Sequence, residues 1–276
     1  MTYSPVMKYS LVPLSFLAMV LSVATAQAKT ICTVIADAAD NKILTQQGDC
    51  SSRVTPASTF KIAISLMGFD AGFLKDAHTP TLPYRAGYPD WGGDAWRQPT
   101  DPTRWIRYSV VWFSQQVTKA LGETRFQQYA TAFDYGNADV SGDPGKHNGL
   151  ERAWISSSLK ISPLEQVAFL GKLVHRQLPV TPHAFDMTNQ IIEVTHSANG
   201  WDIHGKTGMA FPRQADGTFD KAHGHGWFVG WAVKGDHTLL FARLIQDEKA
   251  EAGSAGIRAR DAFLTELPAV ADKLSQ

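Results

Sequence analysis

A serine and a lysine near the start of a predicted helix have the types and the spacing of a catalytic nucleophile and its base. They are Ser58 and Lys61, in a segment that begins at Pro56 and leads into the apolar run 62–67. Proline is tolerated in the first turn of a helix, so the segment predicts the N-terminus of a buried helix. Residues three apart share one helix face, which lets the Ser58 hydroxyl meet the Lys61 amine. A serine hydroxyl needs such a base to act as a nucleophile at neutral pH.

A second pair with the same spacing, Ser157 and Lys160, shows that the spacing alone is weak evidence. A two-residue motif of this kind recurs by chance in a chain of this length. We interpret the second pair as part of a solvated turn before a helix start at Ser162. The assignment of Ser58 and Lys61 therefore depends on other catalytic groups in the chain.

Two later segments supply such groups. Lys206-Thr207-Gly208 lies on or just after a strand predicted from Ile203. Lysine and threonine on an edge strand present a fixed positive charge and a hydroxyl, and glycine lets a substrate or a helix approach closely. Taken alone, the segment is also typical of an ordinary charged edge strand. Ser109 suits either proton transfer near a leaving group or the capping of a helix, and these two roles are compatible.

The predicted elements place strands at both ends of the chain and helices in the middle. Strands are predicted at 32–35 and 43–46, which form a hairpin, and at 203–207, 227–233 and 238–245. Helices are predicted at 109–121, 126–133, 164–174 and 257–274, the last broken or kinked near Pro268. This order indicates an α/β (α+β) fold, with an antiparallel sheet built from N- and C-terminal segments, flanked by helices, and an inserted, mainly helical lobe.

The two lobes have approximate boundaries in the sequence. We place the sheet lobe at about 29–56 plus 200–276 and the helical lobe at about 57–199. A cleft is expected where two lobes meet. Ser58 and Lys206 both fall near this boundary, which places the two motifs at the same cleft.

Residues 1–28 have the pattern of a secretory signal peptide. Lys8 precedes an apolar core at 11–23, and Ala26-Gln27-Ala28 is a small-x-small cleavage sequence. The apolar core is too short to span a bilayer. We therefore expect a periplasmic catalytic domain at 29–276 without a membrane anchor.

The two cysteines of the chain, Cys32 and Cys50, flank the predicted hairpin and could join its ends. In an exported protein an even number of cysteines favours a disulfide, and two separate thiols are the alternative. Cysteine, histidine and acidic residues nowhere show the spacing of a metal site, because His223 and His225 lack a third ligand at a suitable distance in the sequence.

Charge and composition exclude some classes of partner. The chain has 26 basic and 26 acidic residues and contains no basic block. Such a balance gives no support for binding to nucleic acid or to a membrane surface. A small molecule is therefore the expected partner, and the sequence leaves the oligomeric state open.

Taken together, the motifs resemble those of the class D serine β-lactamases, the oxacillinases. The resemblance rests on Ser58-Thr59-Phe60-Lys61, Ser109-Val110-Val111, Tyr135-Gly136-Asn137, Lys206-Thr207-Gly208 and the strand Trp227-Phe228-Val229-Gly230-Trp231. It covers nearly all of the chain after residue 28. The related class A enzymes have Ser-Asp-Asn where this chain has Ser109-Val110-Val111, which favours class D. The resemblance implies the penicillin-recognising serine transferase/β-lactamase fold and the hydrolysis of β-lactam antibiotics, with resistance as the consequence.

The resemblance also implies a modified lysine as the base. An apolar setting formed by Phe60, Val111 and Trp154 would disfavour the charged form of Lys61 and lower its pKa. In the family, the neutral amine adds carbon dioxide and becomes a carbamate (N6-carboxylysine), which serves as base when Ser58 attacks and when water attacks the acyl-enzyme. Trp154 matches the tryptophan that hydrogen-bonds this carbamate, although by itself it is also typical of an ordinary core tryptophan. No other cofactor is implied.

The remaining roles concern the substrate. Backbone N–H groups of Ser58 and Met209 should form an oxyanion hole. The substrate carboxylate requires Lys206, Thr207 and an arginine near the C-terminus, which by family position is Arg258, with Arg260 as the alternative. The predicted site thus comprises catalytic Ser58, Lys61, Ser109, Trp154 and Lys206 and substrate-binding Val111, Thr207, Gly208, Met209 and Arg258.

Two further segments are interpreted as mainly structural. Tyr135-Gly136-Asn137 has a glycine for a turn, an asparagine for loop hydrogen bonds and a tyrosine for packing. The tryptophan-rich segment 90–96 is interpreted as a packed surface loop, with a role in lining the cleft as the alternative.

Two other functions share these motifs. A penicillin-sensing receptor domain would be acylated without turning over, and it normally needs a membrane anchor. A peptidoglycan transpeptidase or carboxypeptidase would act on stem peptides. Sustained consumption of a β-lactam separates the hydrolase from the sensor, and release of D-alanine from a stem peptide would identify the peptidoglycan enzyme.

Overall fold

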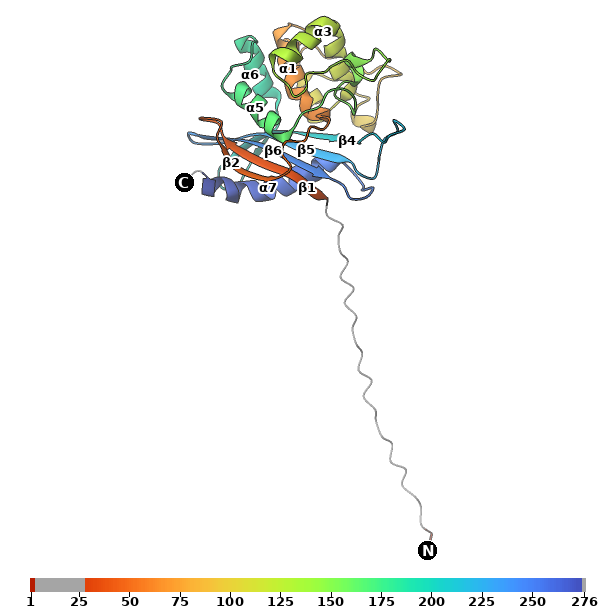
Figure 1. Cartoon of the computed structure of the whole chain (residues 1–276), viewed down its shortest axis with the longest axis vertical. Helices are drawn as coiled ribbons and strands as arrows, with labels where there is room; N and C mark the ends of the chain where they lie inside the picture. Colours follow the sequence, from red (N-terminus) through yellow and green to blue (C-terminus); the bar gives the residue numbers. More distant parts are fainter. Residues whose placement is uncertain (3–27, 275–276) are drawn as a thin grey trace.

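The computed structural model describes residues 1–2 and 28–274 (Figure 1). The strands are β1 (Lys29–Asp37), β2 (Ile43–Gly48), β3 (Val194–His196), β4 (Asp202–Ala210), β5 (His225–Lys234) and β6 (His237–Gln246). The helices are η1 (Ala57–Phe60), α1 (Lys61–Asp70), η2 (Gly93–Ala95), α2 (Pro102–Arg107), α3 (Val111–Ala132), α4 (Gly149–Arg152), α5 (Pro163–Val174), α6 (Pro182–Ile191) and α7 (Ala255–Leu274). The predicted signal peptide lies almost entirely outside these residues. In the part of the chain that is described, no helix is both long and apolar enough to cross a membrane.

All six strands form one antiparallel sheet in the order β2-β1-β6-β5-β4-β3. β1 pairs with β6 from Lys29 opposite Gln246 to Asp37 opposite Leu239, so the two ends of the chain share the centre of the sheet. This confirms the predicted fold class. The edge strand β3 lies upstream of the predicted boundary at residue 200. The sequence does not predict it, because its three residues are all exposed and show no alternation of apolar and polar side chains.

Helices cover both faces of the sheet (Figure 1). α5 packs on one face, with α1, α3 and α6 beyond it, while α7 lies along the other face. Phe228, Phe241 and Phe263 form the centre of the core under α7, with ring centroids 4.9 to 6.2 Å apart. Of the break or kink predicted near Pro268, the break is absent. α7 is one helix through that residue, because Leu267 and Ala271 on either side of it remain buried against the sheet.

The helical lobe follows the predicted start and stop signals. Gly122 has φ 74° and ψ 163° and interrupts α3, which separates the two helices predicted at 109–121 and 126–133. α5 begins with the predicted capping box, in which Ser162 accepts from the Glu165 N–H and Glu165 accepts from the Ser162 N–H. Arg53, which precedes η1, also binds Glu165, and this contact ties the start of α5 to the chain leading to the nucleophile.

A disulfide joins Cys32 in β1 to Cys50 just after β2. Their Cα atoms lie 5.1 Å apart, within the range that a disulfide spans without movement of the backbone. The predicted pairing is therefore confirmed in the structure. The bond closes the β1–β2 hairpin a few residues before the nucleophile segment.

Tyr135-Gly136-Asn137 has the structural role expected from its sequence. Tyr135 is fully buried, and its ring centroid lies 4.7 Å from that of Phe60. Gly136 has φ 59°, a left-handed conformation that glycine adopts without strain. The Asn137 amide donates to the Ser158 carbonyl at 2.8 Å and accepts from the Lys160 N–H at 2.9 Å. The segment therefore packs against Phe60, next to the nucleophile.

Candidate active site

The nucleophile pair lies where η1 passes into α1. Ser58 is in η1 and Lys61 is the first residue of α1, so the single helix start predicted from the sequence is divided into a tight 3₁₀ turn and an α-helix. Lys61 Nζ donates to Ser58 Oγ at 2.9 Å. Ala57 precedes the serine with φ 51°, an uncommon conformation for a residue other than glycine. The predicted meeting of the hydroxyl and the amine is present.

The Lys61 amine is completely buried. Burial disfavours the ammonium and holds the pKa of Lys61 well below its usual value, and the nearby positive charge of Lys206 lowers the pKa further. Phe60 packs against Phe126, Tyr135 and Trp154, which makes the segment before the lysine strongly apolar. A neutral amine beside a serine hydroxyl has the chemistry of a general base.

Lys206 and Ser109 form the second pair of polar groups. Lys206 is buried in β4, and its Nζ donates to Ser109 Oγ at 3.1 Å and to the Thr207 carbonyl at 3.1 Å. Burial lowers the pKa of Lys206 to about 8. Ser109 has φ 56° and lies before α3, whose N-cap is Val110. Ser109 therefore does not cap the helix, and its hydroxyl faces the lysine instead.

Among the described residues, the edge of β4 beside the nucleophile has no strand partner beyond Gly205. β3 pairs with β4 only at 202–204, and the Gly205 N–H donates to the Glu193 carbonyl at 3.2 Å. Alternate N–H groups of a strand point to the same side. The N–H groups of Thr207 and Met209 therefore face this open edge.

Gly208 allows η1 to approach the sheet closely. A Cβ atom at Gly208 would lie 2.9 Å from the Pro56 carbonyl oxygen and 3.1 Å from the Thr59 side chain. Any larger residue would push the nucleophile segment away from β4. The expectation that this glycine permits a close approach is met by η1 itself.

Trp154 is fully buried in the core next to Phe60, with ring centroids 6.1 Å apart. Its Nε1 has no hydrogen-bond partner among the residues that the structure describes. A buried indole N–H usually donates to an acceptor. Thr55 accepts from the Ser156 N–H and donates to the Trp154 carbonyl, which fixes the backbone at this position.

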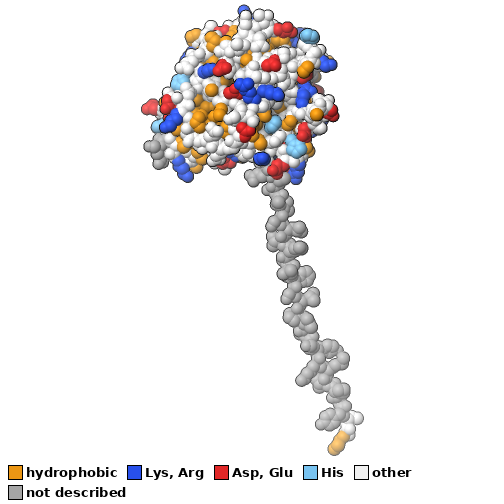
Figure 2. All heavy atoms as spheres, viewed as in Figure 1, with side chains coloured by type: hydrophobic (Ala, Val, Ile, Leu, Met, Phe, Trp, Pro, Cys, Tyr) orange, Lys and Arg blue, Asp and Glu red, His pale blue; other side chains and the backbone are white. Residues whose placement is uncertain are grey.

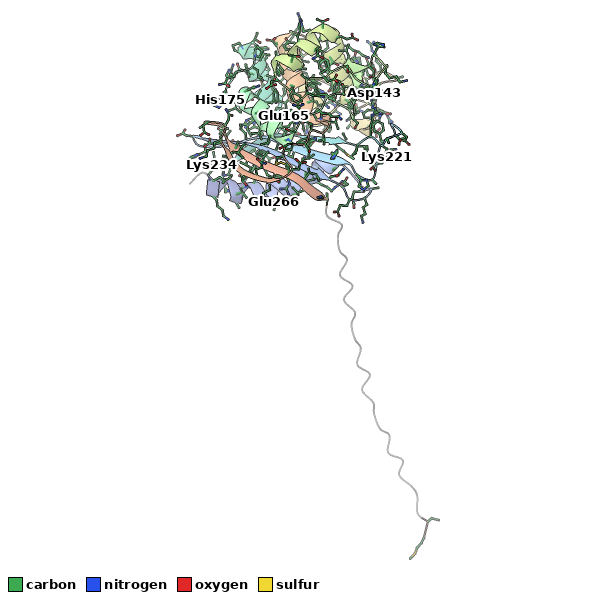
Figure 3. All side chains as sticks on the ribbon, viewed as in Figure 1. Asp143, Glu165, His175, Lys221, Lys234 and Glu266 are labelled. Carbon is green, nitrogen blue, oxygen red and sulfur yellow. A yellow bond between two sulfur atoms is a disulfide. The ribbon has the colours of Figure 1, made fainter. Side chains whose placement is uncertain are left out.

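These groups open onto a cleft of about 870 Å³ between the lobes. Ser58, Ser109, Val111, Thr207, Gly208 and Met209 all line it. Lys61, Trp154 and Lys206 lie behind its wall, because each is almost completely buried. Lys221 of the β4–β5 loop also lines the cleft, and Figure 3 shows it on the same side of the molecule as Asp143, which comes from the helical lobe.

The second serine–lysine pair is not part of this cleft. Ser157 Oγ donates to Asp143 at 2.7 Å. Lys160 is exposed, and its N–H donates to Asn137. The Ser157 hydroxyl is therefore bound to a carboxylate rather than to the Lys160 amine.

The two candidate arginines of α7 lie in different surroundings. Arg258 donates to both oxygens of the buried Asp247 at 2.7 Å and to the Ala252 carbonyl at 2.7 Å. Arg260 lines the cleft together with Thr207. The Arg258 guanidinium is thus held by a buried carboxylate, whereas Arg260 pairs with the exposed Asp261.

Comparisons with known proteins agree with this geometry. A family model described as penicillin binding protein transpeptidase domain matches residues 31–267. The sequence is 44% identical over 249 residues, 90% of each chain, to the β-lactamase OXA-9 of Klebsiella pneumoniae. It is 30% identical over 209 residues to the regulatory protein BlaR1 of Bacillus licheniformis, which covers 75% of this chain and 31% of that protein. The crystal structure of OXA-427, a class D β-lactamase, matches with a TM-score of 0.82 and 49% identity over 88% of this chain and 99% of that one.

The chain belongs to the class D serine β-lactamases. It is therefore a β-lactam hydrolase, as the resemblance of its motifs implies. Within residues 1–2 and 28–274, no group of three or more His, Cys, Asp or Glu side chains is placed to hold a metal ion. Figure 2 shows acidic and basic side chains interspersed on the face that it presents, in keeping with a formal net charge of 0.

Several residues of the β-lactamase cleft lie outside the family motifs. Trp91, Trp96, Ile155, Phe211, Phe219 and Arg107 line it and come from separate loops and helices. The tryptophan-rich segment thus takes the cleft-lining role that the sequence offered as its alternative. A cluster of aromatic residues in a polar loop is a usable signal for such a role, whereas Ile155 and Phe211 come near the site only through the fold.

Proposed function

We propose that this class D β-lactamase opens β-lactams through an acyl-enzyme on Ser58, with a carbamate of Lys61 as the general base. The observation that supports the proposal most directly is the fully buried Lys61 amine, which contacts Ser58 Oγ at 2.9 Å and has a strongly lowered pKa. We further propose that the enzyme acts in the periplasm after removal of residues 1–28 and thereby confers resistance.

Acylation of Ser58 uses the side chains of Lys61 and Ser109 and the backbone N–H groups that line the cleft. Ser58 Oγ attacks the lactam carbonyl and loses its proton toward the Lys61 side chain. The backbone N–H groups of Ser58 and Met209 receive the developing oxyanion, and each such donor typically lowers the barrier by about 3 kcal/mol. Ser109, held by Lys206 at 3.1 Å, is placed to pass a proton to the departing lactam nitrogen.

The residues around Lys61 fit a carbamate. Its formation requires a neutral amine, and burial lowers the pKa of Lys61 and so favours that form. The unpartnered, buried Nε1 of Trp154 is a donor suited to an anionic oxygen. When present, the carbamate supplies an anionic base for the attack of Ser58 and for that of water on the acyl-enzyme. Trp154 and Phe60 exclude bulk water from this base.

The carboxylate of the substrate would bind at the end of the cleft formed by Thr207 and Arg260, with Lys206 behind them. An arginine fork and a hydroxyl suit a carboxylate. Lys206 adds a buried positive charge near the same point.

Exchanging each arginine for glutamine separates the roles of Arg258 and Arg260. The Arg260→Gln variant should lose about 10- to 100-fold in kcat/KM, mainly through KM, because a hydrogen bond to a charged group is lost. The Arg258→Gln variant should instead be less stable by about 3 kcal/mol, because it leaves the buried Asp247 carboxylate without its partner. Steady-state kinetics and urea unfolding measure the two effects. A larger loss of kcat/KM in Arg258→Gln than in Arg260→Gln would return the carboxylate site to Arg258.

A penicillin sensor is the alternative against which hydrolysis is tested, because the chain partly matches BlaR1 and resembles the C-terminal domain of a BlaR penicillin receptor. A sensor is acylated once, whereas a hydrolase releases the product and continues. We expect sustained hydrolysis of a penicillin over many equivalents of enzyme, followed by absorbance. Consumption that stops after one equivalent per Ser58 would favour the sensor over the hydrolase.

A further inference from the structure

Glu193 lies beside the proposed carboxylate site, on the same face of the sheet as Thr207. Val194, the first residue of β3, pairs with His204, and the Gly205 N–H donates to the Glu193 carbonyl at 3.2 Å, so Glu193 continues the pairing opposite Gly205. Opposite residues of an antiparallel pair, and every second residue along a strand, share one face of the sheet. Glu193 and Thr207 are therefore diagonal neighbours on the face that α7 covers.

A small cavity of about 100 Å³ joins these residues to Arg260. Glu193, Thr207 and Arg260 line both this cavity and the large cleft, so the three side chains meet where the two spaces adjoin. Gly205 leaves room there, since a Cβ atom at that position would lie 2.5 Å from the Phe228 ring. The acidic and the basic side chain thus border the same opening.

The carboxylate of Glu193 is free to meet a ligand. It is exposed and forms no ion pair within the described residues, while Arg260 pairs with Asp261 at 2.8 Å. Glu193 raises the pKa of the buried Lys206 and Arg260 lowers it, so both charges act on the same lysine. The other charged residues that line the cleft, among those described, are basic: Arg107, Arg152, Lys221 and Arg260.

We propose that Glu193 is a specificity residue that favours β-lactams with a cationic substituent on the ring carbon next to the one that bears the carboxylate. This inference rests on the proposed function, in which Thr207 and Arg260 hold that carboxylate. In cephalosporins these two ring carbons are bonded to each other, so the substituent on the second carbon is only a few bonds from the carboxylate on the first. A pyridinium or quaternary ammonium group there would lie next to the Glu193 carboxylate and gain a favourable charge interaction.

The test compares two cephalosporins with the same acyl side chain, one carrying a pyridiniomethyl group and the other an acetoxymethyl group at that carbon. The measured quantity is the ratio of kcat/KM for the cationic to the neutral compound. In Glu193→Gln the ratio should fall by about two- to fivefold, the range of an exposed ion pair, and Glu193→Lys should lower it further. Added salt should reduce the difference between wild type and Glu193→Gln.

The control is Glu123→Gln, an equal change of charge at an exposed position of α3 that lines neither space. It should leave the ratio unchanged. An unchanged ratio in both Glu193 variants overturns the proposal. An equal loss for both compounds also overturns it, because Glu193 would then act by positioning Arg260 or Lys206. Hydrolysis of the acetoxymethyl compound by the wild type reports the proposed function independently of this outcome.

Discussion

Replacement of Ser58 by alanine should abolish covalent acylation and reduce kcat by about 10⁶-fold, the scale on which loss of the nucleophile affects serine hydrolases. Ser58 is the serine that both lines the cleft and contacts the Lys61 amine at 2.9 Å. Lys61→Ala should be similarly severe, because the hydroxyl would keep its position but lose the group that accepts its proton. Mass spectrometry after incubation with a slowly hydrolysed β-lactam detects the adduct.

Ser157→Ala provides the matched control. It removes the serine of the second pair, whose hydroxyl is bound to Asp143, and it should keep the adduct and the rate of the wild type. An adduct that persists in Ser58→Ala would contradict the assignment, and peptide mapping would then identify the serine that carries it. Ser109 is the other cleft serine to examine in that case, because it contacts Lys206 at 3.1 Å.

The sequence predicted the parts of this site that depend on local spacing. Ser58 and Lys61 are three residues apart, and their contact follows from the geometry of a single turn. The sequence places Lys206-Thr207-Gly208 on an edge strand, whereas in the structure it lies on β4, the second strand from the edge, beyond the residues that pair with β3. The close packing of η1 on Gly208 follows from the same signal, because glycine marks a close approach of backbones.

Tertiary contacts decide what the sequence left open. Arg258 and Arg260 are two residues apart on one helix and therefore point in different directions. Only the fold shows that Asp247, from the end of β6, reaches Arg258 and leaves Arg260 at the cleft. Of the two roles that the sequence offers for Ser109, the N-cap is not formed, because Val110 caps α3 and the Ser109 hydroxyl accepts from Lys206. Short edge strands such as β3 give no periodic signal at all.

The acidic limb of the pH profile follows from the burial of Lys61. Burial lowers the pKa of Lys61, so its amine is neutral above that lowered pKa and protonated below it. The ammonium can neither accept the Ser58 proton nor add carbon dioxide. Activity should therefore fall as the pH drops through the lowered pKa, and bicarbonate should oppose the fall by drawing the neutral amine into the carbamate.

Trp154 tests the carbamate directly. Trp154→Phe keeps an aromatic ring in the core but removes the buried N–H that has no partner among the described residues. Loss of a hydrogen bond to an anionic group amounts to about 1.5 to 3 kcal/mol, so deacylation should slow by about 10- to 100-fold and the need for bicarbonate should increase. Acylation should be less affected, and the adduct should accumulate.

Carbon-13 NMR with labelled bicarbonate gives a readout independent of turnover. The wild type should show one carbamate resonance that Lys61→Ala lacks and that Trp154→Phe retains only at higher bicarbonate. Degassed enzyme at pH 6 should regain activity when bicarbonate is added, on the same concentration scale as the resonance appears. If the resonance is absent and bicarbonate restores nothing, Lys61 must act as a free amine. Trp154 would then serve the core only, with its N–H turned toward a water molecule.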